Sequence, residues 1–301
     1  LFAASVAASL GLGGGSAAAD TAASIGRSGW TGFAPLTLAK EAGIFKKHGL
    51  DVNIVKVPQA SRHLALASGD IQCAATTVET WIVWNAAGVA TTQIFQLDMS
   101  HGADGMVVRP DIASIADLKG KTVALGPPGS GTVFNCTNIL TALGIIGDIT
   151  PRLMTFADAG RALANGQVDA FCQSSAPAAA VSELAETQGV KILSYAPEQL
   201  AAISETYPFY HDGTMPETMY TGVPATDMPY TTVYWVAHER VPADVVSKLV
   251  GAAYAAQDRL AQGHKAWGQM KPDIENFQKL GAPMHPGAEA YYKENGLWPN
   301  S

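Results

Sequence analysis

Short apolar segments alternate with segments of helical length along most of the chain. Residues 51–57 (DVNIVKV) have the pattern of a β-strand and follow a helical segment at 35–47, which ends before Gly49. A helix at 61–67 then precedes a strand at 71–75, and the same order recurs between residues 118 and 172. This alternation predicts an α/β fold with largely parallel sheets that helices cover on both faces.

One seven-residue pattern occurs twice. Residues 66–72 (LASGDIQ) align without gaps with residues 163–169 (LANGQVD). Each copy follows a helix, turns at a glycine and enters a short apolar strand, after which hydroxyl residues stand at 76–77 and at 174–175. Chance similarity of a common helix–turn–strand unit is the alternative explanation. We interpret the repeat as an indication of two similar α/β lobes.

Two apolar runs mark the edges of the middle segment and predict strands that cross between the lobes. They are residues 105–109 (GMVVR) and 231–237 (TTVYWVA). The first lobe would then contain residues 24–104 and 236–301, and the second lobe residues 105–235. The segment 241–270 has a helical period, and we expect it to pack on the first lobe.

The length and the charge narrow the classes of function. A chain of 301 residues can form two domain cores, and its formal net charge of −7 argues against a nucleic-acid partner. Residues 1–12 are small and apolar, and Gly13–Ser16 and Ala17–Ala19 follow them. An apolar segment followed by small residues is typical of a secretory signal, which would be cleaved after Ala19. The alternative is an unstructured tail of alanine and glycine. We therefore expect a soluble protein exported to the periplasm.

The cysteines and histidines do not have the spacing of metal ligands. Cys73, Cys136 and Cys172 are an odd number, which leaves at least one free thiol in an exported protein. Cys136 and Cys172 could pair if a helix and a strand bring them together, but we favour three buried thiols. The sequence shows neither a nucleophile–base pair nor a complete phosphate loop, so we expect no enzyme, no cofactor and no metal site.

Small hydrogen-bond donors follow the ends of several predicted strands. Ser130, Gly131 and Thr132 follow a strand at 121–125 and open a helix, whose free N–H groups would favour an anion. Residues 76–77 and 28–31 occupy the same position after their strands, with Trp30 as an apolar wall. For any single loop, ordinary helix capping by Ser and Thr is the favoured explanation. Together they predict a binding cleft at the carboxyl ends of the strands.

Two arginines and one aromatic segment are further candidates for the lining of this cleft. Arg27 lies beside the first loop, and Arg62 opens the helix before the strand at 71–75, so either could add positive charge. Residues 207–210 (YPFY) are either a wall of the cleft or a packed turn.

Several of these segments resemble known families of transport receptors. Residues 30–36 (WTGFAPL), 39–52 (AKEAGIFKKHGLDV) and 117–123 (DLKGKTV) resemble substrate-binding proteins of nitrate, sulfonate and taurine ABC importers, a likeness that covers residues 28–125. Residues 128–132 (PGSGT), 166–171 (GQVDAF), 207–210 and above all 285–294 (HPGAEAYYKE) resemble TAXI-family receptors of TRAP transporters, over residues 126–296. The two halves thus point to different membrane partners. Both families share the type II periplasmic-binding-protein fold.

The resemblance implies a monomeric receptor that captures a small anionic solute by hinge closure. The solute would be a sulfonate, a carboxylate or an amino acid, delivered to an ABC or TRAP permease. The alternatives are an enzyme of the thiamin-pyrimidine synthase type on the same fold and a solute-sensing partner protein. The residues expected to line the cleft are Ser28, Trp30, Thr31, Thr76, Thr77, Ser130, Gly131, Thr132, Ser174 and Tyr210.

Overall fold

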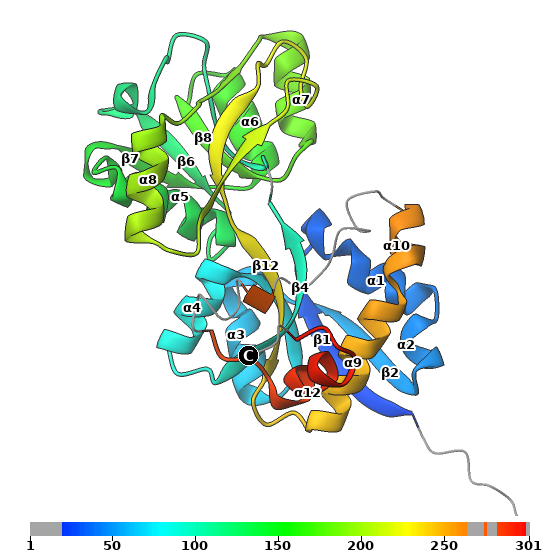
Figure 1. Ribbon diagram of the computed structural model, residues 1–301. Helices are drawn as coiled ribbons and strands as arrows, with labels where there is room; N and C mark the ends of the chain where they lie inside the picture. Colours follow the sequence, from blue (N-terminus) through cyan, green and yellow to red (C-terminus); the bar gives the residue numbers. More distant parts are fainter. Residues whose placement is uncertain (1–19, 101, 264–273, 276–281, 299–301) are drawn as a thin grey trace, which may run out of the picture.

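The computed structural model describes residues 20–100, 102–263, 274–275 and 282–298. Two lobes are visible, one coloured blue, cyan, orange and red, the other green and yellow (Figure 1). The predicted signal at 1–19 and the end of the predicted helical segment, 264–270, lie outside the described residues. No helix of the described segments is long and apolar enough to cross a membrane.

The first lobe is built on a sheet with the strand order β2-β1-β3-β12-β4. Strand β1 runs parallel to β2 and β3, and β12 runs antiparallel to β3 and β4. The strands are β1 (Thr21–Arg27), β2 (Leu50–Lys56), β3 (Cys73–Thr77), β4 (Thr91–Met99) and β12 (Thr232–His238). The helices are α1 (Ala34–Glu41), α2 (Ile44–Lys47), α3 (Arg62–Ser68), α4 (Val78–Ala86), α9 (Ala243–Ala255), α10 (Gln257–Gly263) and α12 (Pro286–Glu294).

The second lobe is built on a sheet with the order β7-β6-β8-β5-β9. Its strands are β5 (Asp104–Val108), β6 (Thr122–Gly126), β7 (Thr150–Leu153), β8 (Ala170–Ser174) and β9 (Lys191–Ile192), and β10 (His211–Met215) pairs separately with β11 (Thr226–Tyr230). Its helices are α5 (Gly131–Ala142), α6 (Phe156–Ala164), α7 (Ala179–Thr187) and α8 (Pro197–Thr206). Single 3₁₀ turns occur at Thr31–Phe33, Gln59–Ser61, Ile115–Leu118 and Ile146–Asp148.

The two sheets share one plan. In each, three parallel strands are followed by one antiparallel strand that enters from the other lobe: β12 in the first sheet and β5 in the second. The repeated seven-residue patterns lead into β3 and β8, which occupy the same position in their sheets. The repeat in the sequence therefore corresponds to equivalent helix–turn–strand units of the two lobes.

The crossings between the lobes differ in detail from the prediction. Residues 105–108 lie wholly within the second sheet as part of β5, and the first crossing is made by the residues between β4 and β5. The second crossing is Thr231, between β11 and β12. Strand β12 pairs with β4 over its full length and with β3 over residues 233–237. Its backbone N–H and C=O groups therefore form their hydrogen bonds within the first sheet. The division at 104/105 and 235/236 stays a prediction.

The predicted helix at 35–47 is interrupted. It forms α1 and α2, which Gly43 separates in a left-handed conformation (φ 67°). A residue with a side chain rarely adopts this conformation, and glycine does so at no steric cost. The break lets α2 turn toward α9, against which it packs.

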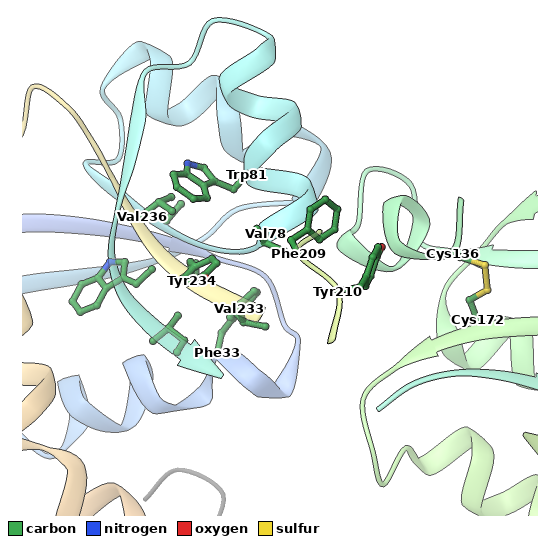
Figure 2. Packing of buried hydrophobic residues seen from close by; sticks show 14 of the residues in the cluster. Phe33, Val78, Trp81, Cys136, Cys172, Phe209, Tyr210, Val233, Tyr234 and Val236 are labelled. Carbon is green, nitrogen blue, oxygen red and sulfur yellow. A yellow bond between two sulfur atoms is a disulfide. The ribbon is translucent and has the colours of Figure 1, made fainter. Parts of the chain in front are cut away.

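A disulfide joins Cys136 of α5 to Cys172 of β8, with their Cα atoms 6.2 Å apart. The preferred expectation of three buried thiols is therefore wrong, and only Cys73 is a free, buried thiol. The reason is tertiary: α5 packs on the face of β8, which brings together two residues 36 positions apart in the sequence. Figure 2 shows this bond in the second lobe, beyond Tyr210.

The segment with the most specific sequence pattern, 285–294, has a structural place in the first lobe. His285 caps α12 and accepts a hydrogen bond from Gly287 N–H (3.2 Å), and Tyr292 donates to Ile94 O of β4 (2.6 Å). A Cβ atom on Gly287 would overlap the backbone of Ala243, so the glycine permits α12 to approach α9. None of these residues lies among those that line the cavity described below.

Candidate functional site

A cavity of about 460 Å³ lies between the lobes, and both lobes contribute to its lining. The first lobe contributes residues from the ends of β1 and β3 and from α3 and α4. The second contributes the start of α5, the end of β8 and the start of α6. The lining residues are Ser28, Gly29, Trp30, Phe33, Gln59, Arg62, Thr76, Thr77, Glu79, Thr80, Trp84, Ser100, Asp104, Pro127, Gly129, Gly131, Thr132, Thr155, Phe156, Ser174, Ser175, Thr231 and Val233.

Most of the sequence-predicted site residues lie around this one cavity. They are Ser28, Trp30, Thr76, Thr77, Gly131, Thr132 and Ser174. Strand β3 extends to Thr77, so Thr76 and Thr77 belong to the strand itself and not to the loop after it. The side chain of Thr31 lies outside the description, while Ser130 and Tyr210 are not among the lining residues.

Ser130 serves α5 instead of the cavity. It is the N-cap of the helix, and its Oγ accepts a hydrogen bond from Val133 N–H (3.3 Å). This bond satisfies one of the N–H groups that a helix start leaves without an intrahelical partner. Gly131 and Thr132, which follow it, line the cavity. The positive end of α5 therefore borders the space between the lobes.

Tyr210 is packed in the contact between the lobes. Its ring lies 4.7 Å from that of Phe209, and its hydroxyl donates to the carbonyl of Asn135 in α5 (3.4 Å). Figure 2 shows Phe209 and Tyr210 between Val78 of the first lobe and the disulfide of the second. Of the two interpretations of residues 207–210, the packed turn agrees with this position.

Trp30 spans the cavity from the first lobe to the second. Its indole Nε1–H donates a hydrogen bond to the carbonyl of Ser174 at the end of β8 (3.0 Å). The indole also packs edge-to-face against the ring of Phe33, with the ring centroids 4.9 Å apart, and this contact restricts its orientation. An aromatic wall is thereby fixed to both lobes at once.

Arg62 is a cation among the described lining residues. Its side chain is 1% exposed, its Nη1 donates to Ala75 O (2.6 Å), and its Cζ lies 5.5 Å from the centre of the Phe33 ring. Burial lowers the pKa of its guanidinium to about 10, so the group stays charged at neutral pH. Its Nε has no hydrogen-bond partner among the described residues. Arg27 bonds instead to the carbonyl of Ser28 and is not a lining residue.

Two buried carboxyl groups in the cavity were missed by the sequence reasoning. Glu79 lies in the first turn of α4 and Asp104 begins β5, and both are largely removed from solvent. Burial raises the pKa of Glu79 to about 8 and that of Asp104 to about 6. Each of them is the single acidic residue of a segment that is otherwise free of charged residues. An unpaired charge is costly in a core, so this pattern could have indicated a functional carboxyl group.

These carboxyl groups are linked through the crossing segments. Glu79 Oε2 accepts a hydrogen bond from Thr231 Oγ1 (3.2 Å), and Asp104 accepts one from Ser100. Glu79 Oε1, Asp104 Oδ1 and Ser174 Oγ make no hydrogen bond of ordinary geometry with the described residues, although Ser174 is close enough to Asp104 to lower the pKa of its carboxyl. A polar group that enters the cavity would satisfy these atoms, which makes the site suited to binding. No group of three metal-ligating side chains occurs in the described part of the chain.

Comparisons with known proteins agree with this geometry. The sequence model of the NMT1-like family matches residues 52–296. The periplasmic aliphatic sulphonate-binding protein SsuA of Escherichia coli has 20% identity and a TM-score of 0.59, over 93% of this chain and 84% of that chain. The alkanesulfonate-binding protein SsuA of Xanthomonas axonopodis has 19% identity and a TM-score of 0.53, over 94% and 96%.

A third solved structure, a Xanthomonas citri protein bound to ATP, has 14% identity and a TM-score of 0.57, over 91% of this chain and 98% of that chain. At these identities the likeness establishes the fold. The predicted two-lobed periplasmic-binding fold is confirmed, as is the resemblance to nitrate and sulfonate receptors. The resemblance of residues 126–296 to TAXI receptors stays a prediction.

Proposed function

The chain belongs to the NMT1-like family, and on that basis we propose that it is an exported receptor that captures a small anionic solute between its lobes. The observation that carries the proposal is the cavity itself. Hydroxyl groups from β3, α5 and β8 converge on it from both lobes, and several buried polar atoms in it have no partner among the described residues. A solute held by both lobes would favour their closure.

The charge of the solute follows from the fixed dipoles and the cation of the site. The positive end of α5 and the guanidinium of Arg62 both border the cavity. A sulfonate or carboxylate group would accept hydrogen bonds from these donors and from Thr132. MOPS, found in the Xanthomonas axonopodis neighbour, and ATP, found in the Xanthomonas citri neighbour, also carry anionic groups.

Delivery to a membrane importer completes the proposal. The closed receptor would dock on a permease of an ABC or a TRAP transporter and release the solute there. The receptor would act as a monomer in the periplasm. The identity of the solute separates the two partners, because we associate a sulfonate with the ABC class and a dicarboxylate or glutamate with the TRAP class.

A thermal-shift screen of the purified chain tests this function. The panel contains ethanesulfonate, taurine, succinate, glutamate, nitrate, ethylamine and guanidinium. A solute at about 100 times its Kd adds about 2.7 kcal/mol to the free energy of unfolding, which gives a clear increase in Tm. A panel in which no compound stabilises the protein would contradict the receptor and favour the enzyme.

The variant Thr132→Val connects a positive result to the cavity. It keeps the shape of the side chain and removes one donor, so we expect the binding free energy of an anionic solute to weaken by about 1 kcal/mol, which increases the Kd about fivefold. Thr137→Val is the matched control, since Thr137 lies farther along the same helix and is not a lining residue. Equal affinities of both variants in calorimetry would place the site elsewhere.

A further inference from the structure

We infer that Glu79 determines which charge the cavity accepts, and that it contacts the anionic group of the solute as a neutral carboxylic acid that donates a hydrogen bond. This inference rests on the proposed function and concerns the same cavity. It assigns a role to an acidic side chain that would otherwise repel an anion.

The carboxyl group of Glu79 is held at one oxygen and open at the other. Oε2 accepts the hydrogen bond from Thr231 Oγ1 (3.2 Å), while Oε1 makes no hydrogen bond of ordinary geometry with the described residues, and the hydroxyl of Thr77 is a further donor near the carboxyl that lowers its pKa. The side chain is 2% exposed, yet Glu79 is one of the residues that line the cavity. A buried carboxylate normally needs several donors, and hydroxyl groups such as that of Thr231 supply only one proton each. The open oxygen is therefore the position from which a proton can be offered to a solute.

The open oxygen lies next to the start of α5. A Cβ atom placed on Gly131 would be 2.9 Å from Glu79 Oε1, so the carboxyl of the first lobe reaches the first residue of a helix in the second lobe. This helix start is where the proposed anion would bind. An ionised Glu79 at this position would repel that anion, whereas its neutral form would add a donor beside the N–H groups of the helix.

The charged and titratable neighbours of Glu79 also favour the neutral form. Burial raises the pKa of Glu79 most, and the acidic group of Asp104 in β5 adds to this effect; the pKa reaches about 8 although hydrogen bonds from Thr77, from the backbone and from Thr231 lower it. Tyr210 lies close enough to Glu79 for the charge of Glu79 to raise the pKa of its hydroxyl. Burial raises this pKa further, so Tyr210 is uncharged at neutral pH. Arg62 lines the same cavity, but its guanidinium donates hydrogen bonds to the carbonyls of Ala75 and Val57.

Calorimetry of the full chain with sodium ethanesulfonate measures the protonation of the site during binding. A sulfonate stays ionised from about pH 6 to about pH 10, so only groups of the protein titrate in this range. Because the solute would bind the neutral form of Glu79, we expect a constant Kd up to about pH 7 and an increase of about tenfold per pH unit above about pH 8.

Two variants separate the carboxyl groups. Glu79→Gln keeps a neutral donor that cannot ionise, so its Kd should lose the dependence on pH. Asp104→Asn changes the other carboxyl and should keep an increase of the Kd with pH, with its onset moved to lower pH, because the charge of Asp104 helps to raise the pKa of Glu79. A Kd of the wild type that improves with increasing pH, or a dependence that survives in Glu79→Gln, would overturn the inference.

A measurement without solute tests the same point in the free protein. The infrared difference spectrum between the wild type and Glu79→Gln at pH 7 should contain the C=O band of a neutral carboxylic acid, and a carboxylate band alone would overturn the inference. In the thermal-shift panel, stabilisation only by ethylamine or guanidinium would overturn the inference and the anionic character of the solute, while the role of a solute receptor would stand. A panel without any stabilising compound would remove the proposed function and the inference with it.

Discussion

Ser100 and Thr231 join the two segments that cross between the lobes. Ser100 N–H donates to Thr231 O (2.9 Å), and Thr231 N–H donates to Ser100 Oγ (2.8 Å). The hydroxyl of Ser100 lies within hydrogen-bond distance of both Thr231 O (3.1 Å) and the carboxyl of Asp104, and it can donate its one proton to either of them. Thr231 in turn donates to Glu79, so the segments that cross between the lobes and the cavity share one hydrogen-bond network.

The first prediction concerns this network. Ser100→Ala removes the acceptor of the Thr231 N–H and takes one hydrogen bond away from the carboxyl of Asp104. We expect the free energy of unfolding to decrease by about 1–3 kcal/mol, because both groups are buried. Chemical denaturation measures the change. Ser68→Ala removes hydrogen bonds of an exposed serine and is the matched control, so equal losses in both variants would contradict the role of the network.

The second prediction concerns the dependence of stability on pH. The pKa values of Glu79 (to about 8), Asp98 and Asp104 (both to about 6) are raised in the folded protein, mainly by burial. Between about pH 4 and pH 8 the folded state therefore binds more protons than the unfolded chain. The free energy of unfolding should decrease as the pH rises through this window, on the order of 1 kcal/mol per pH unit for each group that titrates.

Denaturation curves at a series of pH values measure this slope. Glu79→Gln should flatten the part between about pH 6 and pH 8, where Glu79 is the main raised carboxyl. Glu183→Gln, at an exposed glutamate of α7, is the control and should keep the slope of the wild type. A wild-type stability that increases from pH 5 to pH 8 would contradict the neutral state of the buried carboxyl groups.

The third prediction concerns the disulfide. Its reduction releases a loop with a sequence separation of 36 residues, so the free energy of unfolding should decrease by about 3–4 kcal/mol. Denaturation with and without a reductant measures the loss. The double variant Cys136→Ser/Cys172→Ser should resemble the reduced protein and show no further response to reductant. Three reactive thiols in the protein unfolded without reductant would show that the bond is absent.

The fourth prediction concerns the approach of α12 to α9. Gly287→Ala places a methyl group against the backbone of Ala243, which cannot move away as a flexible side chain would. We expect a loss of about 2 kcal/mol in the free energy of unfolding. Gly147→Ala, where the added Cβ meets nothing within 4 Å, is the control. Because residues 285–294 are remote from the cavity, solute affinity per folded molecule should stay unchanged.

Several features of the molecule are properties of local sequence. The alternation of helices and strands, the repeat that leads into β3 and β8, and the donors at 76–77 and 131–132 could all be identified without coordinates. They depend on hydrophobic period, on glycine turns and on the rule that parallel strands present their carboxyl ends at one edge. The sequence therefore determined the fold class and much of the lining of the cavity.

Contacts between distant residues were decided by the tertiary structure alone. The pairing of Cys136 with Cys172, the bond from Trp30 to Ser174 and the packing of Tyr210 depend on how helices and lobes meet. Local sequence patterns carry no information on contacts between residues that are far apart in the chain. The two buried carboxyl groups are the clearest case: their neutral state results from the absence of water around Glu79 and Asp104, which follows only when both lobes enclose them.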